Sequence, residues 1–376
     1  MSFLAIPLIT LSLALGLNAG RSGASALPQP IWQVDLHSFG YDGYKPNREF
    51  RTGPTLHPLC FPSNGVLIVS FLKHDATTAL MAPDRNNGNL PLKLHAIFLS
   101  AEAGTVQATK TWPTPHPHVD VIPARNGQFA VLLPGKLTLY SPDIEPLKEL
   151  SIPLPPPPLD PPYDMASPQG ESAVLGFSGK DSHIDWINTD NLRILGSWKE
   201  PMTTCSVSDR QLAICQEEGF VSEVILRDVT GAERLLCRDR DNCGLAQFVN
   251  DNLLCLVRTH SLRLMTTSRQ MLFSQDFPED DYIATPMAIS SNGQRFAEGV
   301  WAPRGGNFDT NFRTLSKRVM VFNVPTRQWI YILSAKEQKL KAPMSVALSP
   351  DGTLMAILDP SAIVRVYRLP DAPSPP

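Results

Sequence analysis

The chain carries no excess of charge of either sign. Its 33 Lys and Arg residues nearly balance its 36 Asp and Glu residues, which gives a formal net charge of −3. A nucleic-acid-binding protein usually shows a basic footprint, so this balance predicts no nucleic-acid partner. Helical patterning is also missing, because no stretch repeats its apolar residues with the spacing of an amphipathic helix.

Contiguous catalytic and cofactor motifs are absent. The sequence has no Gly-x-Ser-x-Gly elbow, no Gly-rich phosphate loop, no His-Glu-x-x-His and no Cys-x-x-Cys-His. Each of these motifs places the groups of one known chemistry in a short segment. We therefore assign no catalytic residue and expect neither a cofactor nor a bound metal.

What the chain has instead is proline and a repeated short pattern. Its 36 prolines in 376 residues exceed the usual share of ~5%. Alternating apolar runs are separated by turns whose third residues are 65, 127, 170, 210, 252, 293 and 352, at steps of 62, 43, 40, 42, 41 and 59. The turns are rich in Asn, Asp and Gly, which tolerate the positive φ of tight hairpins.

Each repeat has the content of four short strands. In residues 203–236, four apolar alternating runs at 203–207, 211–215, 221–226 and 232–236 are separated by polar breaks. Four strands in about 40 residues correspond to one blade of a β-propeller. The last repeat, from residue 345, is one strand short, and residues 31–36 form a lone strand pattern before the first. We expect an all-β, single seven-bladed propeller whose last blade is closed by the N-terminal strand.

The clearest turn carries a family resemblance. The segment Ser349-Pro-Asp-Gly-Thr353 resembles the turn between the innermost strands of WD40-like and YVTN-like bacterial propellers. The chain lacks the Trp-Asp and Gly-His pairs of true WD40 repeats. The resemblance covers nearly the whole chain and implies the fold only, since function depends on sites carried by a fold.

The N-terminus has the features of an export signal. An apolar run of 15 residues, 3–17, precedes Ala24-Ser25-Ala26, a small-residue cleavage pattern. No Lys or Arg precedes the run, so an uncleaved N-terminal anchor is the alternative. We predict a signal peptide at 1–26, the propeller at 27–370 and a Pro-rich tail at 371–376. The mature protein is then periplasmic or extracellular, with no integral membrane association.

Six cysteines follow the signal, and export permits disulfides. Cys237 and Cys243 flank a short loop between blades and form the first candidate bridge. Cys205 and Cys215 flank one hairpin and form the second, provided that the register places them opposite each other. The alternative is that these residues are buried thiols that pack as small hydrophobic groups.

Two long steps in the repeat locate insertions in blades one and six, between the second and third strands. Loops on a rigid scaffold often carry function, and aromatic and Arg side chains suit a contact surface. The candidate binding residues are Asp84 and Arg85 in the first insertion and Arg304, Phe308, Asp309, Phe312 and Arg313 in the second. Both insertions can equally be tolerated surface loops.

Two functions stay open at this point. The first is an exported, non-catalytic binding module for a protein or glycan partner. The second is a channel-centred enzyme, such as a metal-dependent lactonase-like hydrolase, with ligands from several blades. Asp120, Asp164 and Glu298 are candidates for it, but they do not recur at one offset from the turns, which favours the binding module.

Overall fold

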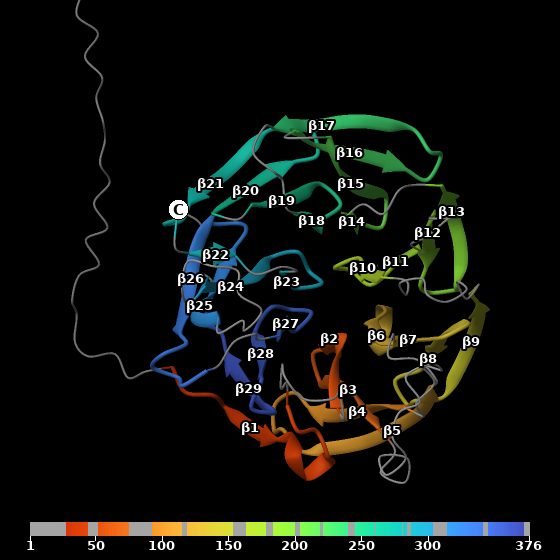
Figure 1. Cartoon of the computed structure of the whole chain (residues 1–376), viewed down its shortest axis with the longest axis vertical. Helices are drawn as coiled ribbons and strands as arrows, with labels where there is room; N and C mark the ends of the chain where they lie inside the picture. Colours follow the sequence, from red (N-terminus) through yellow and green to blue (C-terminus); the bar gives the residue numbers. More distant parts are fainter. Residues whose placement is uncertain are drawn as a thin grey trace, which may run out of the picture.

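Seven antiparallel sheets stand in a ring in the computed structural model of the chain (Figure 1). The structure describes residues 28–43, 52–74, 92–114, 119–152, 163–177, 183–199, 204–218, 221–239, 245–258, 260–279, 281–283, 287–303, 314–340 and 345–371. Six sheets have four strands and one has five. The fold is therefore the all-β, seven-bladed propeller that the repeat predicted.

The strands follow one another from the centre of each blade to its outer edge. Blade one holds β2 (Thr52–Ser63), β3 (Val66–His74), β4 (Leu92–Ser100) and β5 (Val106–Thr114); blade two β6 (Asp120–Pro123), β7 (Phe129–Leu133), β8 (Lys136–Tyr140) and β9 (Pro146–Ser151); blade three β10 (Tyr163–Ala166), β11 (Ser172–Phe177), β12 (His183–Asn188) and β13 (Arg193–Trp198); and blade four β14 (Thr204–Val207), β15 (Gln211–Glu218), β16 (Val221–Asp228) and β17 (Glu233–Asp239).

The remaining three blades complete the ring. Blade five holds β18 (Leu245–Asn250), β19 (Leu253–Arg258), β20 (Ser261–Thr266) and β21 (Met271–Asp276); blade six β22 (Tyr282–Ile283), β23 (Ala288–Ile289), β24 (Arg295–Pro303), β25 (Thr314–Asn323) and β26 (Gln328–Ser334); and blade seven β27 (Ser345–Leu348), β28 (Leu354–Asp359), β29 (Ile363–Arg368) and β1 (Trp32–Asp35). Two 3-10 helices, η1 (Leu36–Phe39) and η2 (Arg125–Gly127), join strands.

The N-terminal strand closes the ring, as predicted. Strand β1 pairs antiparallel with β29, with Trp32 opposite Val366. The Trp32 indole Nε1 also donates to the carbonyl oxygen of Ala101 in blade one, at 2.8 Å. The first described segment of the chain thus completes blade seven and fastens it to blade one, which leaves β29 without an open edge.

Apolar side chains fill every seam between neighbouring blades. The buried residues form seven clusters, each drawn from two adjacent sheets. Between blades three and four, for example, Trp186 packs with Val207 and Ile214. Each blade is thus apolar on both faces, which explains why most strands of the second position, such as β7, β11, β19 and β28, are nearly continuous apolar runs.

The turns that mark the repeat join the first and second strands of each blade. Gly352 has a φ of +73° in the Pro-Asp-Gly turn, and Gly293 has a φ of +65° in the corresponding turn of blade six. A side chain in this left-handed region is strained. The preference for glycine that defined the sequence repeat is therefore a backbone requirement of the hairpin.

Candidate functional site

A channel lined by six of the seven blades runs through the centre of the ring. It encloses about 160 Å³. Polar and apolar groups share its walls in similar measure. The lining residues are His57, Leu59, Cys60, Phe61, Ile122, Pro123, Ala166, Ser167, Pro168, Gln247, Met287, Ala288, Ile289, Ser291, Val346, Ala347 and Leu348. A concave site with a few placed polar groups is the usual form of a small-ligand pocket.

The most organised polar group on this wall is a histidine–aspartate pair. His57 Nδ1 lies 2.5 Å from Asp120 Oδ2, and the backbone N–H of His57 donates to Oδ1 of the same carboxylate at 3.2 Å. The Val121 N–H donates to that oxygen at 2.9 Å. Asp120 is fully buried, while 32% of the His57 side chain is exposed. The carboxylate fixes both the ring and the main chain of His57.

His57 occupies this position because the innermost strand of blade one leaves its regular ladder. Between the pairs Pro54–Phe71 and Leu59–Val69, four residues of β2 stand opposite the single residue Ser70. A bulge of this kind re-aims a side chain, and such bulges occur preferentially beside functional sites. Here it brings an imidazole from blade one to a carboxylate of blade two.

Blade six has a similar irregularity. Its innermost strand is divided into β22 and β23, and between the pairs Ile283–Val300 and Ala288–Ala297 only two residues of β24 intervene. The amide of Gln247, from blade five, accepts from the Met287 N–H at 3.0 Å and donates to the Met287 carbonyl at 2.9 Å. A neighbouring blade thus supplies the bonds that the ladder does not.

Burial disfavours the charged form of two further groups. Burial raises the pKa of Glu298 well above its usual range, against the lowering effect of the Gly299 N–H. Its side chain is 1% exposed, and Oε2 has no hydrogen-bond partner among the described residues. Burial, together with the charge of Asp120, raises the pKa of Cys60. Cys60 is therefore a thiol and not a thiolate nucleophile.

The inner turns form a second polar feature, which we name the turn ring (residues 63–65, 125–127, 168–170, 208–210, 250–252, 291–293 and 350–352). Its members, and the residues directly beside them, bond across the seams. Asp351 N donates to Asn64 Oδ1, and Asn292 Nδ2 donates to the Asp351 carbonyl, both at 3.0 Å. The Ser167 hydroxyl donates to Asp209 at 2.8 Å. These bonds tie successive blades together where the sheets converge.

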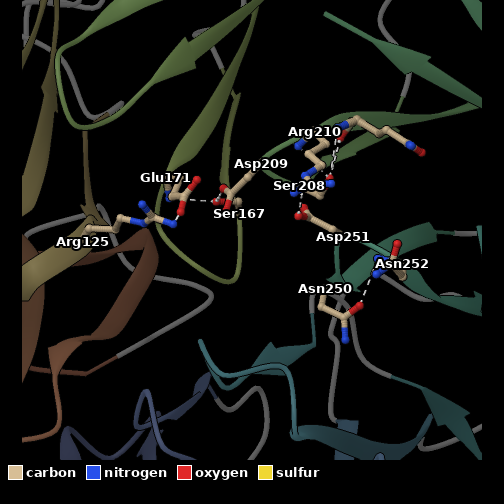
Figure 2. A network of polar contacts seen from close by, with 10 residues as sticks. Arg125, Ser167, Glu171, Ser208, Asp209, Arg210, Asn250, Asp251 and Asn252 are labelled. Carbon is tan, nitrogen blue, oxygen red and sulfur yellow. Dashed lines mark hydrogen bonds and ion pairs between the residues drawn. The ribbon is translucent and has the colours of Figure 1, made fainter.

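Figure 2 shows the charged part of the turn ring, in blades two to five. Arg125 pairs with Glu171, and Arg210 Nε lies 3.3 Å from Asp251 Oδ2. Burial raises the pKa of Asp209 to about 6; the hydrogen bond from Ser167 opposes this rise and the charge of Asp251 adds to it. Each seam between these blades therefore has its own polar link.

The binding residues predicted from the insertions are Asp84, Arg85, Arg304, Phe308, Asp309, Phe312 and Arg313. All seven lie outside the described residues, so their role stays a prediction. The bounds of the flanking strands place both insertions where the repeat did, between β3 and β4 and between β24 and β25. Of the channel candidates, Asp120 and Glu298 lie as given above. For Asp164 the structure gives only its backbone position in β10, opposite Leu175.

The cysteine predictions have two outcomes. In the hairpin of β14 and β15, Cys215 stands opposite Thr204 and Cys205 opposite Ile214. The two cysteines are thus offset by one residue, the condition for a bridge between them is not met, and Cys215 is a buried free thiol. Cys243 lies outside the described residues, so the Cys237–Cys243 bridge stays a prediction.

Sequence reasoning did not find His57, Gln247 or the polar links of the turn ring. Asp120 is 63 residues from His57 along the chain, and Gln247 is 40 residues from Met287. The one available signal was the length of the first and sixth repeats. Both blades with long repeats also have irregular inner strands. The corresponding ladders of blades two, three, four and seven are regular, and that of blade five has one register shift beside its turn.

Neither the described helices nor the described acidic and thiol groups suggest a membrane span or a metal centre. No helix in the described parts of the chain is long and apolar enough to cross a membrane. Among the same residues, no group of three or more His, Cys, Asp or Glu side chains is placed to hold a metal ion.

Comparisons with known proteins identify the fold. No protein-family profile and no curated protein sequence matches the chain. Solved structures do match. A chain of the "Crystal Structure of Mitotic Checkpoint Complex" has a TM-score of 0.54 and 13% identity, covering 97% of this chain and 100% of that one. A chain of "Kuenenia stuttgartiensis Hydrazine Synthase" has a TM-score of 0.50 and 15% identity, covering 87% and 99%. At the level of fold, the chain is a seven-bladed β-propeller that resembles WD40-like structures.

Proposed function

We propose that this protein is an exported, non-catalytic binding module that takes a protein or glycan partner on one face of the propeller. That face is the one from which the insertions of blades one and six extend. The connections between blades leave the sheets at the same end, because every blade alternates its strand direction. The turn ring lies at the opposite end.

The observation that carries this proposal is the coincidence of insertions and strand irregularities. Blades one and six have the long connections. In the same blades, the innermost strand loses its regular pairing with the second strand near the end that carries the insertion. Local rules of a fold are broken mainly at functional sites. Both departures are capped by a side chain from a neighbouring blade, Asp120 or Gln247, so they are built features of the wall.

The position of the two blades supports a single contact area. Blade seven lies between blades six and one in the ring (Figure 1). Each of these two neighbours carries one insertion. A partner seated over blade seven can therefore touch both insertions at once. The second insertion supplies Phe308, Phe312 and Arg313, and aromatic residues and Arg are enriched at the cores of protein interfaces.

The test is affinity capture from the envelope fraction with three forms of the mature protein. The first is wild type, the second replaces residues 304–313 by Gly-Gly, and the third keeps the loop length and carries Phe308→Ala and Phe312→Ala. We expect a partner that wild type retains and that both variants bind at least about tenfold more weakly. A mass spectrum that places the N-terminus of the exported protein at residue 27 would establish cleavage of the signal.

The matched control for this capture is Asp143→Asn. Asp143 lies on the exposed turn between β8 and β9, at the same end of the propeller as the turn ring. It should bind like wild type. Equal retention of every partner by wild type and both loop variants, with unchanged thermal unfolding, would rule out the insertion of blade six as the contact surface.

One observation favours a second candidate, the channel-centred enzyme. A buried carboxylate that orients an imidazole is the usual arrangement of a proton-transfer pair, and His57 and Asp120 have this geometry on the channel wall. The raised pKa of Cys60 removes the nearest thiol as its nucleophile. Hydrolysis of a lactone by the wild-type protein that is lost in His57→Gln would favour this candidate over the binding module.

A further inference from the structure

The outermost strand of blade six, β26, has an open edge without a charged residue. Among the described residues, β26 pairs with β25 on one side and with no strand on the other, and it lies on the outside of the ring (Figure 1). Its sequence is Gln328-Trp-Ile-Tyr-Ile-Leu-Ser334. The strand therefore has neither a charge nor a proline, two of the devices that protect an edge from pairing.

The other six outermost strands are protected in this way. Each of β1, β5, β9, β13, β17 and β21 carries at least one Asp, Glu, Lys or Arg, and β5 and β9 each carry a proline as well. Lys110 lies in the middle of β5, for example, and Lys148 and Glu149 lie next to each other in β9. The uncharged edge is thus particular to blade six.

The side chains of β26 favour strand pairing and are held in place. Trp329 packs in the seam toward blade five, and Ile330 and Tyr331 pack in the seam toward blade seven. The Trp329 indole also donates to Gln275 Oε1 of blade five at 2.5 Å. Ile332 is 56% exposed, more than any other of the exposed large apolar residues in the described parts of the chain. A short uncharged strand of Trp, Tyr and Ile is typical of segments that associate edge to edge.

A second copy of this chain matches the edge residue by residue. When two identical strands pair antiparallel about Tyr331, Ile330 of each copy stands opposite Ile332 of the other. In the same register, Trp329 stands opposite Leu333. Apolar side chains therefore face apolar side chains across the whole strand, an arrangement that stabilises an antiparallel pair.

The charges that flank β26 do not oppose this pairing. Arg327 precedes the strand and Lys336 follows it. In the register centred on Tyr331, they stand opposite Ala335 and Thr326, so no two like charges meet. Both copies use the same edge, so the contact is isologous and closes at a dimer.

From these observations we propose that two copies of this protein associate through antiparallel pairing of β26 with β26. The sheets of the two blades six then form one continuous sheet, in which main-chain hydrogen bonds supply affinity and the apolar side chains supply specificity. The contact lies on the outer side of the ring, so it is independent of the partner surface proposed above.

The test is sedimentation velocity of the mature protein from ~1 to ~200 µM, a range suited to a weak contact of small area. We expect a reversible change from monomer to dimer. Ile332→Lys should weaken dimerisation at least about tenfold, because a Lys on an edge strand blocks pairing. Thermal unfolding should show that this variant, changed at an exposed position, folds like wild type.

The matched control is Leu147→Lys. Leu147 is 51% exposed on β9, the outermost strand of blade two, so this variant makes the same change on a protected edge and should dimerise like wild type. Hydrogen exchange of wild type at both ends of the concentration range locates the contact without any substitution. Exchange should slow at high concentration in residues 328–334 and stay unchanged in β5 and β9.

Three results would overturn the proposal. Wild type could stay monomeric at the highest concentration, Ile332→Lys could dimerise as tightly as wild type, or assembly could continue beyond the dimer. The first result would leave the edge to a strand of another protein or to parts of this chain outside the described ranges. The second would place the contact elsewhere, and the third would indicate a head-to-tail contact instead of an edge paired with itself.

Discussion

At the scale of single residues, corresponding turns of the ring hold carboxylates in opposite environments. Asp351 accepts hydrogen bonds from the Ser349 hydroxyl at 2.7 Å and from the Thr353 N–H at 3.0 Å. Burial would raise its pKa, but these hydrogen bonds outweigh burial and lower it. Asp209 accepts a hydrogen bond from the Ser167 hydroxyl, and burial raises the pKa of Asp209 to about 6.

Asp209→Asn should stabilise the protein at pH 7. The raised pKa means that Asp209 contributes stability below its unfolded value of 3.8 and that this contribution is lost as the pH rises through about 6. Asn keeps an acceptor for Ser167 and removes the charge. We expect a gain of about 1 kcal/mol at pH 7, after allowance for partial exposure of the group, which disappears below pH 4. Chemical denaturation from pH 4 to pH 8 measures it.

Asp351→Asn is the control of opposite sign. Its lowered pKa means that the stabilising contribution of Asp351 is present above pH 3.8 and is lost as the pH falls through its folded value. This substitution should cost roughly 0.5–1.5 kcal/mol at pH 7. If Asp209→Asn lost stability at pH 7 in the same way, our account of the buried Asp209 charge would be wrong.

The individual residues of the candidate site were the least predictable part of the molecule. Asn, Asp and Gly in the inner turns follow from local backbone geometry, so the sequence repeat reveals them directly. The pair of His57 with Asp120 depends on a bulge in β2 and on the seam between two blades. No local period records such a contact, and Asp120 therefore emerged only as an isolated candidate.

At the scale of elements, the closing strand β1 is the piece on which the ring depends. Trp32 is half-buried on this strand. Its ring approaches Gly104 so closely that a Cβ on that glycine would lie 2.6 Å from the indole. One residue thus joins the last blade to the first through both packing and the hydrogen bond to Ala101.

Trp32→Ala should destabilise the closure. It removes the indole packing and leaves the Ala101 carbonyl without its donor, at an expected cost of about 2 kcal/mol for a partly buried aromatic side chain. Gln33→Ala, on the exposed side of the same strand, should stay within about 0.5 kcal/mol of wild type. Thermal unfolding gives the comparison, and faster hydrogen exchange in β29 would show that the closing strand has loosened. Equal stability of both variants would contradict the role of Trp32.

Elements were largely predictable because strands and tight turns are local. The runs expected at 203–207, 211–215, 221–226 and 232–236 begin within one residue of β14, β15, β16 and β17, and the last repeat begins at residue 345 with β27, as expected. The division of the innermost strand of blade six was not foreseen. It depends on the Gln247 amide of the neighbouring blade, and a pattern of alternating residues within one repeat carries no information on that bond.

At the scale of the whole molecule, the two ends of the propeller have different roles in our account. The turn ring links successive blades by polar contacts across several seams and serves the structure. The opposite end carries the two insertions and the departures of β2 and β22–β23 from their ladders. The central claim is that partners are bound at this second end.

The most direct measurement is hydrogen exchange of the wild-type protein alone and with the captured partner. We predict that the partner slows exchange at the insertion ends of β3, β4, β24 and β25 and leaves the turn ring unchanged. Protection confined to the turn ring, or to the outer strands, would contradict the claim that the insertion-bearing face is the binding surface.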